Sequence, residues 1–184
     1  MNLSHFTTLL AIGILPASSA TIFFDLQGNG GFGLLGSNEP TAISPAGTGG
    51  EILGGISFDD VSNVITINVG WGSGQGFSDL TSDVNGSHLH GPTASSGTAS
   101  FNQNAGVLQG LTRSGNSANG GTISQSFTLS AANEIALLNG QLYINIHTDD
   151  NGGGEIRGNL VAVPEPTSAS LLLLAGLPLL RRRR

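Results

Sequence analysis

The chain has 184 residues, lacks cysteine and lysine, and carries a formal net charge of −6 at pH 7. Thiolate metal sites and cysteine nucleophiles are therefore excluded, and a domain of this size can bury a sufficient core without disulfides. Residues 21–163 hold eleven acids and two cations, Arg113 and Arg157, for a formal charge of −9. Such a surface repels phosphate backbones, so we expect no binding of nucleic acid.

Residues 1–20 have the pattern of a secretory signal peptide. An apolar stretch from Phe6 to Leu15 is followed by Pro16 and by small residues that end at Ala20. We therefore expect signal peptidase to cut after Ala20, which would also remove His5. The alternative is a buried N-terminal helix.

The next part of the chain, residues 21–162, predicts a single domain built from short strands. We expect strands at residues 21–26, 51–58, 61–69, 85–90, 106–111, 122–129, 141–147 and 155–161. Alternating apolar and polar residues mark several of them as half-buried. Residues 28–50, which are rich in glycine and interrupted by prolines, are expected to form a loop, and the Ser/Asn/Gly-rich stretch between residues 111 and 122 a turn.

One helix is expected, over residues 130–138. Ser130 can cap its start, and Asn139 with Gly140 stops it. Strands at this spacing with one short helix predict an all-β fold, either an antiparallel β-sandwich or a Greek-key barrel.

Three histidines lie in two of the predicted strands. His88 and His90 are two residues apart, so their side chains share one face of a strand. His147 lies at the end of a later strand, on the same face of it as Tyr143 and Asn145. If the two strands are neighbours, three imidazoles converge and offer a copper or zinc site with an open position. The alternative is a structural role, in which the histidines hydrogen-bond loops and hold the turn that follows His90.

Two other groups of residues offer weaker binding chemistry. The acidic turn from Asp149 to Gly152 presents oxygen atoms that suit Ca²⁺, but it lacks the EF-hand spacing, so an ordinary turn is the favoured interpretation. Trp71 and Tyr143 are able to stack on a sugar ring, although isolated aromatics usually pack inside a domain.

Five short motifs, in their order and spacing, resemble the CHRD domain, which is named for its repeats in chordin and is common in bacterial exported proteins. The motifs are Gly36–Pro40, His88–Pro92, Leu138–Gly140, Tyr143–Thr148 and Gly154–Gly158. Where the family usually has Val-Pro-Pro after Asn-Glu, this chain has Pro-Thr-Ala. The resemblance implies an immunoglobulin-like or related β-sandwich and little about activity.

The histidine pattern also resembles copper–zinc superoxide dismutase, in which a His-x-His strand and a later histidine supply copper ligands. Here His88, His90 and His147 occur in the same order, followed by an acidic turn and by Arg157. The cysteines of that family are absent, and no histidine remains for a bridging ligand or a zinc site. The resemblance implies at most a copper-only variant or a decayed relative of that family. If metal binds, Arg157 is expected to steer an anion towards it. A salt bridge between Arg157 and a nearby carboxylate is the alternative.

The last 22 residues resemble the PEP-CTERM sorting signal of Gram-negative bacteria. Pro164, Glu165 and Pro166 precede an apolar run at residues 171–180 and four arginines at residues 181–184. A bilayer core needs about 20 apolar residues, so this run suits a transient insertion, and the arginines would hold the tail on the cytoplasmic side. The resemblance implies cleavage by an exosortase near the Pro-Glu-Pro motif. A plain C-terminal tail anchor is the alternative.

Together these features predict an exported protein in three parts: a signal peptide (1–20), a CHRD domain (21–162) and a sorting signal (163–184). The leading expectation is a non-enzymatic structural or binding module at the cell surface, in the extracellular matrix or secreted. The alternative is a copper- or zinc-binding domain that uses His88, His90 and His147, with activity on superoxide. A second alternative is a module that binds exopolysaccharide, which species with this sorting signal often make.

Overall fold

A computed structural model describes residues 21–164 of the chain. The expected signal peptide, and the sorting signal beyond Pro164, lie outside the described residues. The described part forms eleven strands, one α-helix and three short 3-10 helices. The strands are β1 (Thr21–Gly28), β2 (Gly31–Phe32), β3 (Leu34–Leu35), β4 (Thr48–Asp59), β5 (Val64–Trp71), β6 (Val84–His90), β7 (Val107–Gly110), β8 (Arg113–Ser117), β9 (Gly120–Thr128), β10 (Tyr143–Thr148) and β11 (Ile156–Ala162), and the helices are η1 (Gly36–Asn38), η2 (Ser73–Gln75), η3 (Gly97–Ser100) and α1 (Ala131–Leu138).

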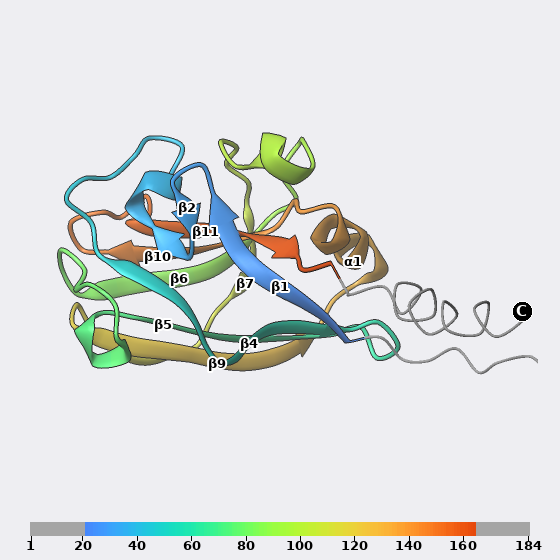
Figure 1. Ribbon diagram of the computed structural model, residues 1–184, viewed down its shortest axis with the longest axis horizontal. Coiled ribbons are helices and arrows are strands. Elements are labelled where there is room, and N and C mark those ends of the chain that lie inside the picture. Colours follow the sequence, from blue (N-terminus) through green and yellow to red (C-terminus); the bar gives the residue numbers. More distant parts are fainter. Residues whose placement is uncertain (1–20, 165–184) are drawn as a thin grey trace, which may run out of the picture.

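The strands form one antiparallel sheet that folds over on itself. Its order is β7-β6-β10-β11-β1-β4-β5-β9-β8, with β2 paired to β1, and β3 paired to both β11 and β4. In Figure 1, β6, β10 and β11 lie above β4, β5 and β9, and β1 runs diagonally from one group to the other, so the sheet makes two layers. The expected all-β sandwich with one short helix is thereby confirmed.

The hydrophobic core lies between the two layers. Successive side chains of a strand point to opposite faces, so the apolar residues at every second position point into this core. On β5, Ile65, Ile67 and Val69 are fully buried, and on β10 the same holds for Ile144 and Ile146. Burying such side chains stabilises the fold by about 1.5–3 kcal/mol each. The residues that alternate with Ile144 and Ile146 point to the other face of the sheet, where the histidines lie.

The helix begins where the sequence predicts. The hydroxyl oxygen of Ser130 accepts a hydrogen bond from the backbone N–H of Asn133, which caps the first turn of α1. Ala136 and Leu137 are the buried residues of this helix and pack against the core.

Two regions differ from the expectation. The predicted loop at residues 28–50 contains β2, β3 and η1, and β4 begins within it at Thr48. The predicted turn between residues 111 and 122 contains β8, an edge strand that pairs only with β9. All five residues of β8 are polar or glycine, so the sequence shows no alternation of apolar and polar residues there. The strand forms because its main chain pairs with that of β9.

Both ends of the described chain leave the domain together. Phe24 of β1 pairs with Ala162 of β11, and the N–H of Val163 donates to the carbonyl oxygen of Phe23 at 2.8 Å. In Figure 1, β1 begins and β11 ends towards the right of the domain, whereas the arrowhead of β10 points to the left. Within residues 21–164, none of the helices is long and apolar enough to span a membrane.

Candidate metal centre

The register between β6 and β10 brings the three histidines together. Asn145 of β10 lies opposite His88, Tyr143 opposite His90, and His147 opposite Gly86. Because Leu89 points into the core, the histidines on either side of it point to the outer face of the sheet. The two histidine strands are therefore neighbours, which is the condition that the sequence alone left open.

Gly86 leaves the room that the cluster needs, a role that sequence reasoning missed. A β-carbon at this position would lie 3.2 Å from Cε1 of His88 and 3.3 Å from Cδ2 of His147. A side chain there would therefore push the two imidazoles apart. The sequence signal was available, since Gly86 also precedes His88 by two residues and so shares its face of the strand.

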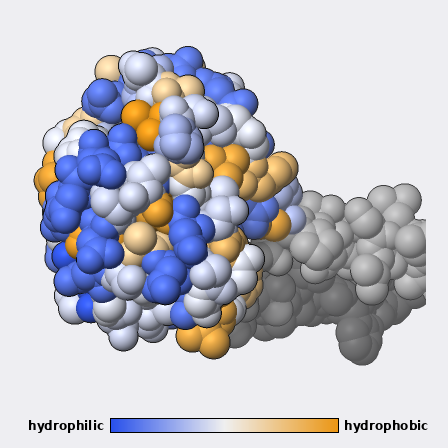
Figure 2. Space-filling view, turned by 90° about the vertical axis from the view of Figure 1, so that its left-hand side faces the viewer, coloured by the Kyte–Doolittle hydropathy of each residue, from blue (hydrophilic) through white to orange (hydrophobic). Residues whose placement is uncertain are grey.

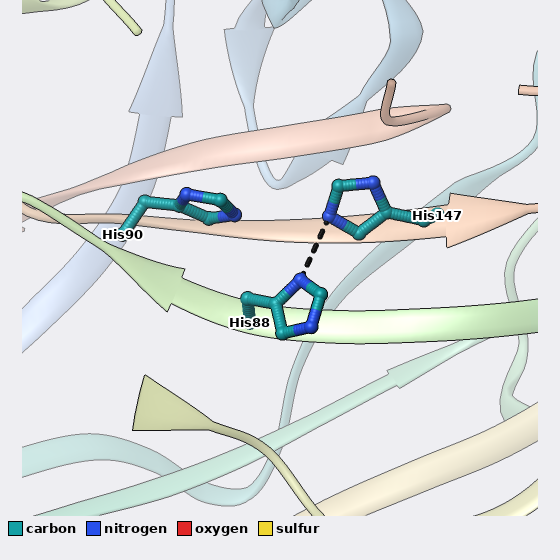
Figure 3. A group of neighbouring side chains, drawn as sticks. All are labelled: His88, His90 and His147. Atoms are coloured by element: carbon teal, nitrogen blue, oxygen red, sulfur yellow. Dashed lines mark hydrogen bonds between the residues drawn. The ribbon is translucent and has the colours of Figure 1, made fainter. Parts of the chain in front are cut away.

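The imidazoles form a compact group (Figure 3). Nδ1 of His88 lies 3.0 Å from Nε2 of His147. The ring centroid of His90 is 5.5 Å from that of His88 and 5.9 Å from that of His147. One nitrogen from each of the three rings lies within 4.8 Å of the other two.

Backbone carbonyls set the tautomers of two of these rings. Nδ1 of His90 donates to the carbonyl oxygen of Ala105 at 3.0 Å, and Nδ1 of His147 donates to that of Gly152 at 3.0 Å. A carbonyl oxygen only accepts, so in each neutral ring Nδ1 carries the proton and Nε2 keeps its lone pair. Nδ1 of His88 then donates to Nε2 of His147. Nε2 of His90 is buried and has no hydrogen-bond partner in the described residues.

Burial favours the neutral form of all three rings. It lowers the pKa of His88, and the positive charge of Arg113 lowers that pKa further. Burial is also the largest cause of the lowered pKa of His90, where it outweighs the hydrogen bond to Ala105. Burial likewise lowers the pKa of His147, against the hydrogen bond to Gly152. Neutral imidazole is the form that binds metal ions.

Tyr143 packs against His90 and is anchored to the same backbone segment. The two rings are stacked, with 4.9 Å between their centroids and 3° between their planes. The N–H of Ala105 donates to the hydroxyl oxygen of Tyr143 at 3.0 Å, and that hydroxyl faces the carbonyl oxygen of Ala105 at 3.3 Å. Ala105 therefore links the phenol to the carbonyl that orients His90.

Arg157 lies on the other side of Tyr143. Its guanidinium carbon is 3.5 Å from the centre of the Tyr143 ring, and its side chain is fully buried. The guanidinium donates to Gln103 O at 2.8 Å and more weakly to Asn104, Ser100 and Asn159. This buried position favours a role in holding the loop at residues 100–104. Steering of an anion by Arg157 stays a prediction.

Glu39 is the carboxyl group whose charge acts on Arg157. Burial raises the pKa of Glu39 to about 7, although the charge of Arg157 and a hydrogen bond with Asn145 oppose the rise. Oε1 of Glu39 and Oδ1 of Asn145 are buried without a hydrogen-bond partner in the described residues. A cavity of about 200 Å³ adjoins this carboxyl group and is also lined by Asn104 and Gly154.

The other sequence candidates have ordinary surroundings. Asp149 and Asp150 are exposed, and Asp149 accepts a hydrogen bond from Asn85 at 3.1 Å. Trp71 is fully buried and Tyr143 is 2 % exposed, so neither presents its ring to a sugar at the surface. Figure 2, which views the end of the domain remote from the chain ends, shows a mainly hydrophilic face with scattered apolar residues.

The expected processing sites lie at or beyond the two ends of the described chain. Pro164 is exposed at the end of the described chain. Ala20, Glu165 and Pro166 lie outside the described residues, so cleavage after Ala20 and at the Pro-Glu-Pro motif stays a prediction.

The family model of the CHRD domain matches residues 32–160, a stretch that includes the three histidines, Tyr143 and Arg157. The chain belongs to the CHRD family. Comparison with curated proteins and with solved structures gave no match. CHRD domains occur in extracellular or secreted proteins, which agrees with the expected export of this chain. The resemblances to the PEP-CTERM signal and to superoxide dismutase remain predictions.

Proposed function

We propose that this CHRD domain is an exported binding module that holds one copper or zinc ion through His88, His90 and His147. The observation that carries the proposal is Nε2 of His90, which is buried, unprotonated and without a hydrogen-bond partner, beside two other imidazoles. Leaving a buried polar atom unpaired costs about 1–3 kcal/mol. A bound ion would satisfy this nitrogen.

The ligand atoms follow from the tautomers. His90 and His147 would bind through Nε2, because their Nδ1 protons are held by Ala105 and Gly152. His88 would bind through Nδ1, which faces His147. In the metal-free protein this nitrogen donates to Nε2 of His147, so its proton would have to pass to Nε2 of His88 when an ion binds. Metal-binding histidines usually donate their second ring nitrogen to a carbonyl or carboxylate in this way, which fixes the ring and raises its basicity.

The spacing is close to that of a bound site. Imidazole nitrogen lies about 2.0–2.1 Å from zinc, so ligand atoms in a trigonal or tetrahedral site lie roughly 3.3–3.6 Å apart. The pair at 3.0 Å would open slightly and the wider pairs, up to 4.8 Å, would close.

A purely structural role accounts for less of this arrangement. Histidines that only hold loops need one hydrogen bond each, and His90 and His147 make those bonds through Nδ1. Such a role gives no reason for three further nitrogens to converge on one region of the outer face. Metal binding accounts for both sets of nitrogens at once.

The proposal includes export through the signal peptide expected at residues 1–20. It also includes cleavage of the sorting signal expected at residues 163–184. The mass of the protein released by cells that express it tests this part. Masses that start at Thr21 and end near Pro164 support it, and retention of residues 171–184 contradicts exosortase cleavage.

Metal titration of the purified protein tests the proposed site. Cu(I), Cu(II) and Zn(II) are each added against a competing chelator dye, and the stoichiometry is measured for the wild type, for a His88→Ala/His147→Ala double variant and for Asn85→Ala. Asn85 is exposed on the same strand, β6, and so controls for a change outside the cluster. One ion per chain in the wild type and in Asn85→Ala, lost in the double variant, is expected. Equal binding by all three proteins, or none by any, contradicts the proposal.

A further inference from the structure

Three loops meet at a cavity beside Glu39, outside the histidine cluster. Its volume is about 200 Å³. Pockets that hold drug-sized ligands have roughly 300–1,000 Å³, so this cavity suits one small molecule. The loop after η1 supplies Glu39, Pro40, Thr41 and Ile43, the loop before β7 supplies Asn104, and the turn before β11 supplies Gly153 and Gly154.

The walls of this cavity offer both kinds of hydrogen-bonding group. Glu39 is 8 % exposed, and its Oε1 has no hydrogen-bond partner in the described residues. Asn104 is exposed, and its Oδ1 accepts a hydrogen bond from Nη1 of Arg157 at 3.3 Å, which leaves its amide NH2 group as a donor. A carboxylate accepts hydrogen bonds and an amide NH2 group donates them. A hydroxyl group does both, so it matches this pair.

Part of the lining is apolar. Pro40 and Ile43 line the cavity beside the polar groups. Small-molecule sites usually combine apolar contact with a few polar groups that fix the orientation of the ligand. A sugar ring has hydroxyl groups around its edge and C–H groups on its faces, so one sugar residue can meet both parts of this lining.

The charges beside the cavity favour a neutral ligand. Arg157 lies close enough to Glu39 for the charge of each to act on the pKa of the other. A cation in the cavity would be repelled by Arg157, and an anion by the carboxylate of Glu39. Burial also raises the pKa of Glu39 to about 7, so near neutral pH this group attracts a cation with only part of a full charge. A neutral molecule avoids both repulsions.

We propose that the cavity beside Glu39 binds one neutral sugar residue through hydroxyl groups that pair with Glu39 and Asn104. This site is separate from the metal centre and needs no bound ion. It also differs from a site in which an aromatic ring stacks on the sugar, because Trp71 is fully buried and Tyr143 is 2 % exposed. Polar cavities also hold water, so the competing outcome is a cavity that contains water alone.

Saturation-transfer difference NMR on the purified full chain, kept metal-free by a chelator, tests the proposal. The probes are the methyl glycosides of D-glucose, D-galactose, D-mannose and N-acetyl-D-glucosamine. Gly153→Leu adds a side chain at the wall of the cavity, and Gly152→Leu adds the same side chain at the neighbouring residue, which is not part of that wall. At both glycines a β-carbon would meet no atom within 4 Å, and neither glycine has a positive φ, so we expect both variants to fold.

At least one of the glycosides should bind the wild type. Gly152→Leu should keep this affinity, and Gly153→Leu should weaken it by about tenfold or more, because the added side chain takes up room that the sugar needs. Glu39→Gln keeps the size of the side chain but replaces one acceptor oxygen by an NH2 donor. We expect it to weaken binding by about threefold to tenfold, as the loss of one hydrogen bond would.

Failure of all four glycosides to bind the wild type overturns the proposal and leaves the cavity to water. Equal binding by the wild type and Gly153→Leu also overturns it, because the sugar would then lie elsewhere. If Gly153→Leu does not fold, Glu39→Gln decides, and an affinity equal to that of the wild type contradicts the proposal. The metal titration is a separate measurement, so none of these outcomes bears on the metal centre.

Discussion

The ring of Tyr143 lies parallel to the imidazole of His90, with 4.9 Å between the ring centroids and 3° between the planes. Tyr143 is 2 % exposed, and its hydroxyl group contacts the main chain of Ala105, whose carbonyl oxygen orients His90. One side chain thus restrains the plane of the His90 ring directly and its tautomer through Ala105. Such support is what holds a ligand in a productive orientation.

Replacing Tyr143 separates these two effects. Tyr143→Phe keeps the stacked ring and removes the hydroxyl group, so we expect a loss of about 1–2 kcal/mol in the free energy of unfolding and a several-fold weaker metal affinity. Tyr143→Leu also removes the stacking and should weaken metal binding further. Denaturant unfolding and the competition titration measure the two quantities. Metal affinity unchanged in both variants would show that Tyr143 only fills space.

The pKa values of the three histidines should lie below the ordinary value of 6.5 for a histidine side chain. Their lowered pKa values mean that the folded protein binds fewer protons than the unfolded chain just below pH 6.5. Their contribution to stability is therefore present above pH 6.5 and is lost as the pH falls through the lowered values. Proton NMR of the metal-free protein should give imidazole midpoints below 6.5. Titration midpoints at or above pH 6.5 would contradict the conclusion that burial favours neutral imidazoles, the form that binds a metal ion.

Gly154 should not tolerate a side chain. It has a φ of +125°, and a β-carbon there would lie 2.3 Å from Oδ1 of Asn145. We expect Gly154→Ala to destabilise the protein by about 2–4 kcal/mol and to weaken metal binding, because the same turn carries the carbonyl of Gly152 that orients His147. Gly153→Ala is the matched control, since a β-carbon at Gly153 meets no atom within 4 Å. Thermal unfolding of the two variants checks this, and equal melting temperatures would contradict it.

Glu39 should make stability fall as the pH rises. Its pKa is raised from 4.5 to about 7 in the folded protein, so ionisation costs free energy only in the fold. The stabilising contribution of the neutral carboxyl group is complete below pH 4.5 and is lost by about pH 7, a change of up to about 3 kcal/mol. Glu39→Gln should therefore gain stability relative to the wild type between pH 5 and pH 8.

Urea midpoints at the two pH values measure this gain. Glu134→Gln on α1 serves as a control for the loss of one negative charge. If the wild type and Glu39→Gln show parallel pH dependence, Glu39 ionises as freely in the fold as in the unfolded chain, contrary to the expectation.

Much of the fold is predictable from local patterns. Alternating apolar residues predicted β5 and β10, and Ser130 with Asn139 and Gly140 predicted the ends of α1. The polar edge strand β8 was not predictable in this way, because its main chain rather than its side chains determines the pairing. The same holds for β2 and β3, which are only two residues long.

At the candidate site, the shared face of His88 and His90 follows from local sequence, since side chains alternate along a strand. The distance of 3.0 Å between Nε2 of His147 and Nδ1 of His88 does not follow from local sequence, because it depends on the pairing of β10 with β6 across 59 residues of chain. The tertiary structure also decided the position of Arg157, which is buried against Tyr143 instead of open to solvent. Periodicity specifies which way a side chain points, whereas long-range pairing and packing specify what it meets.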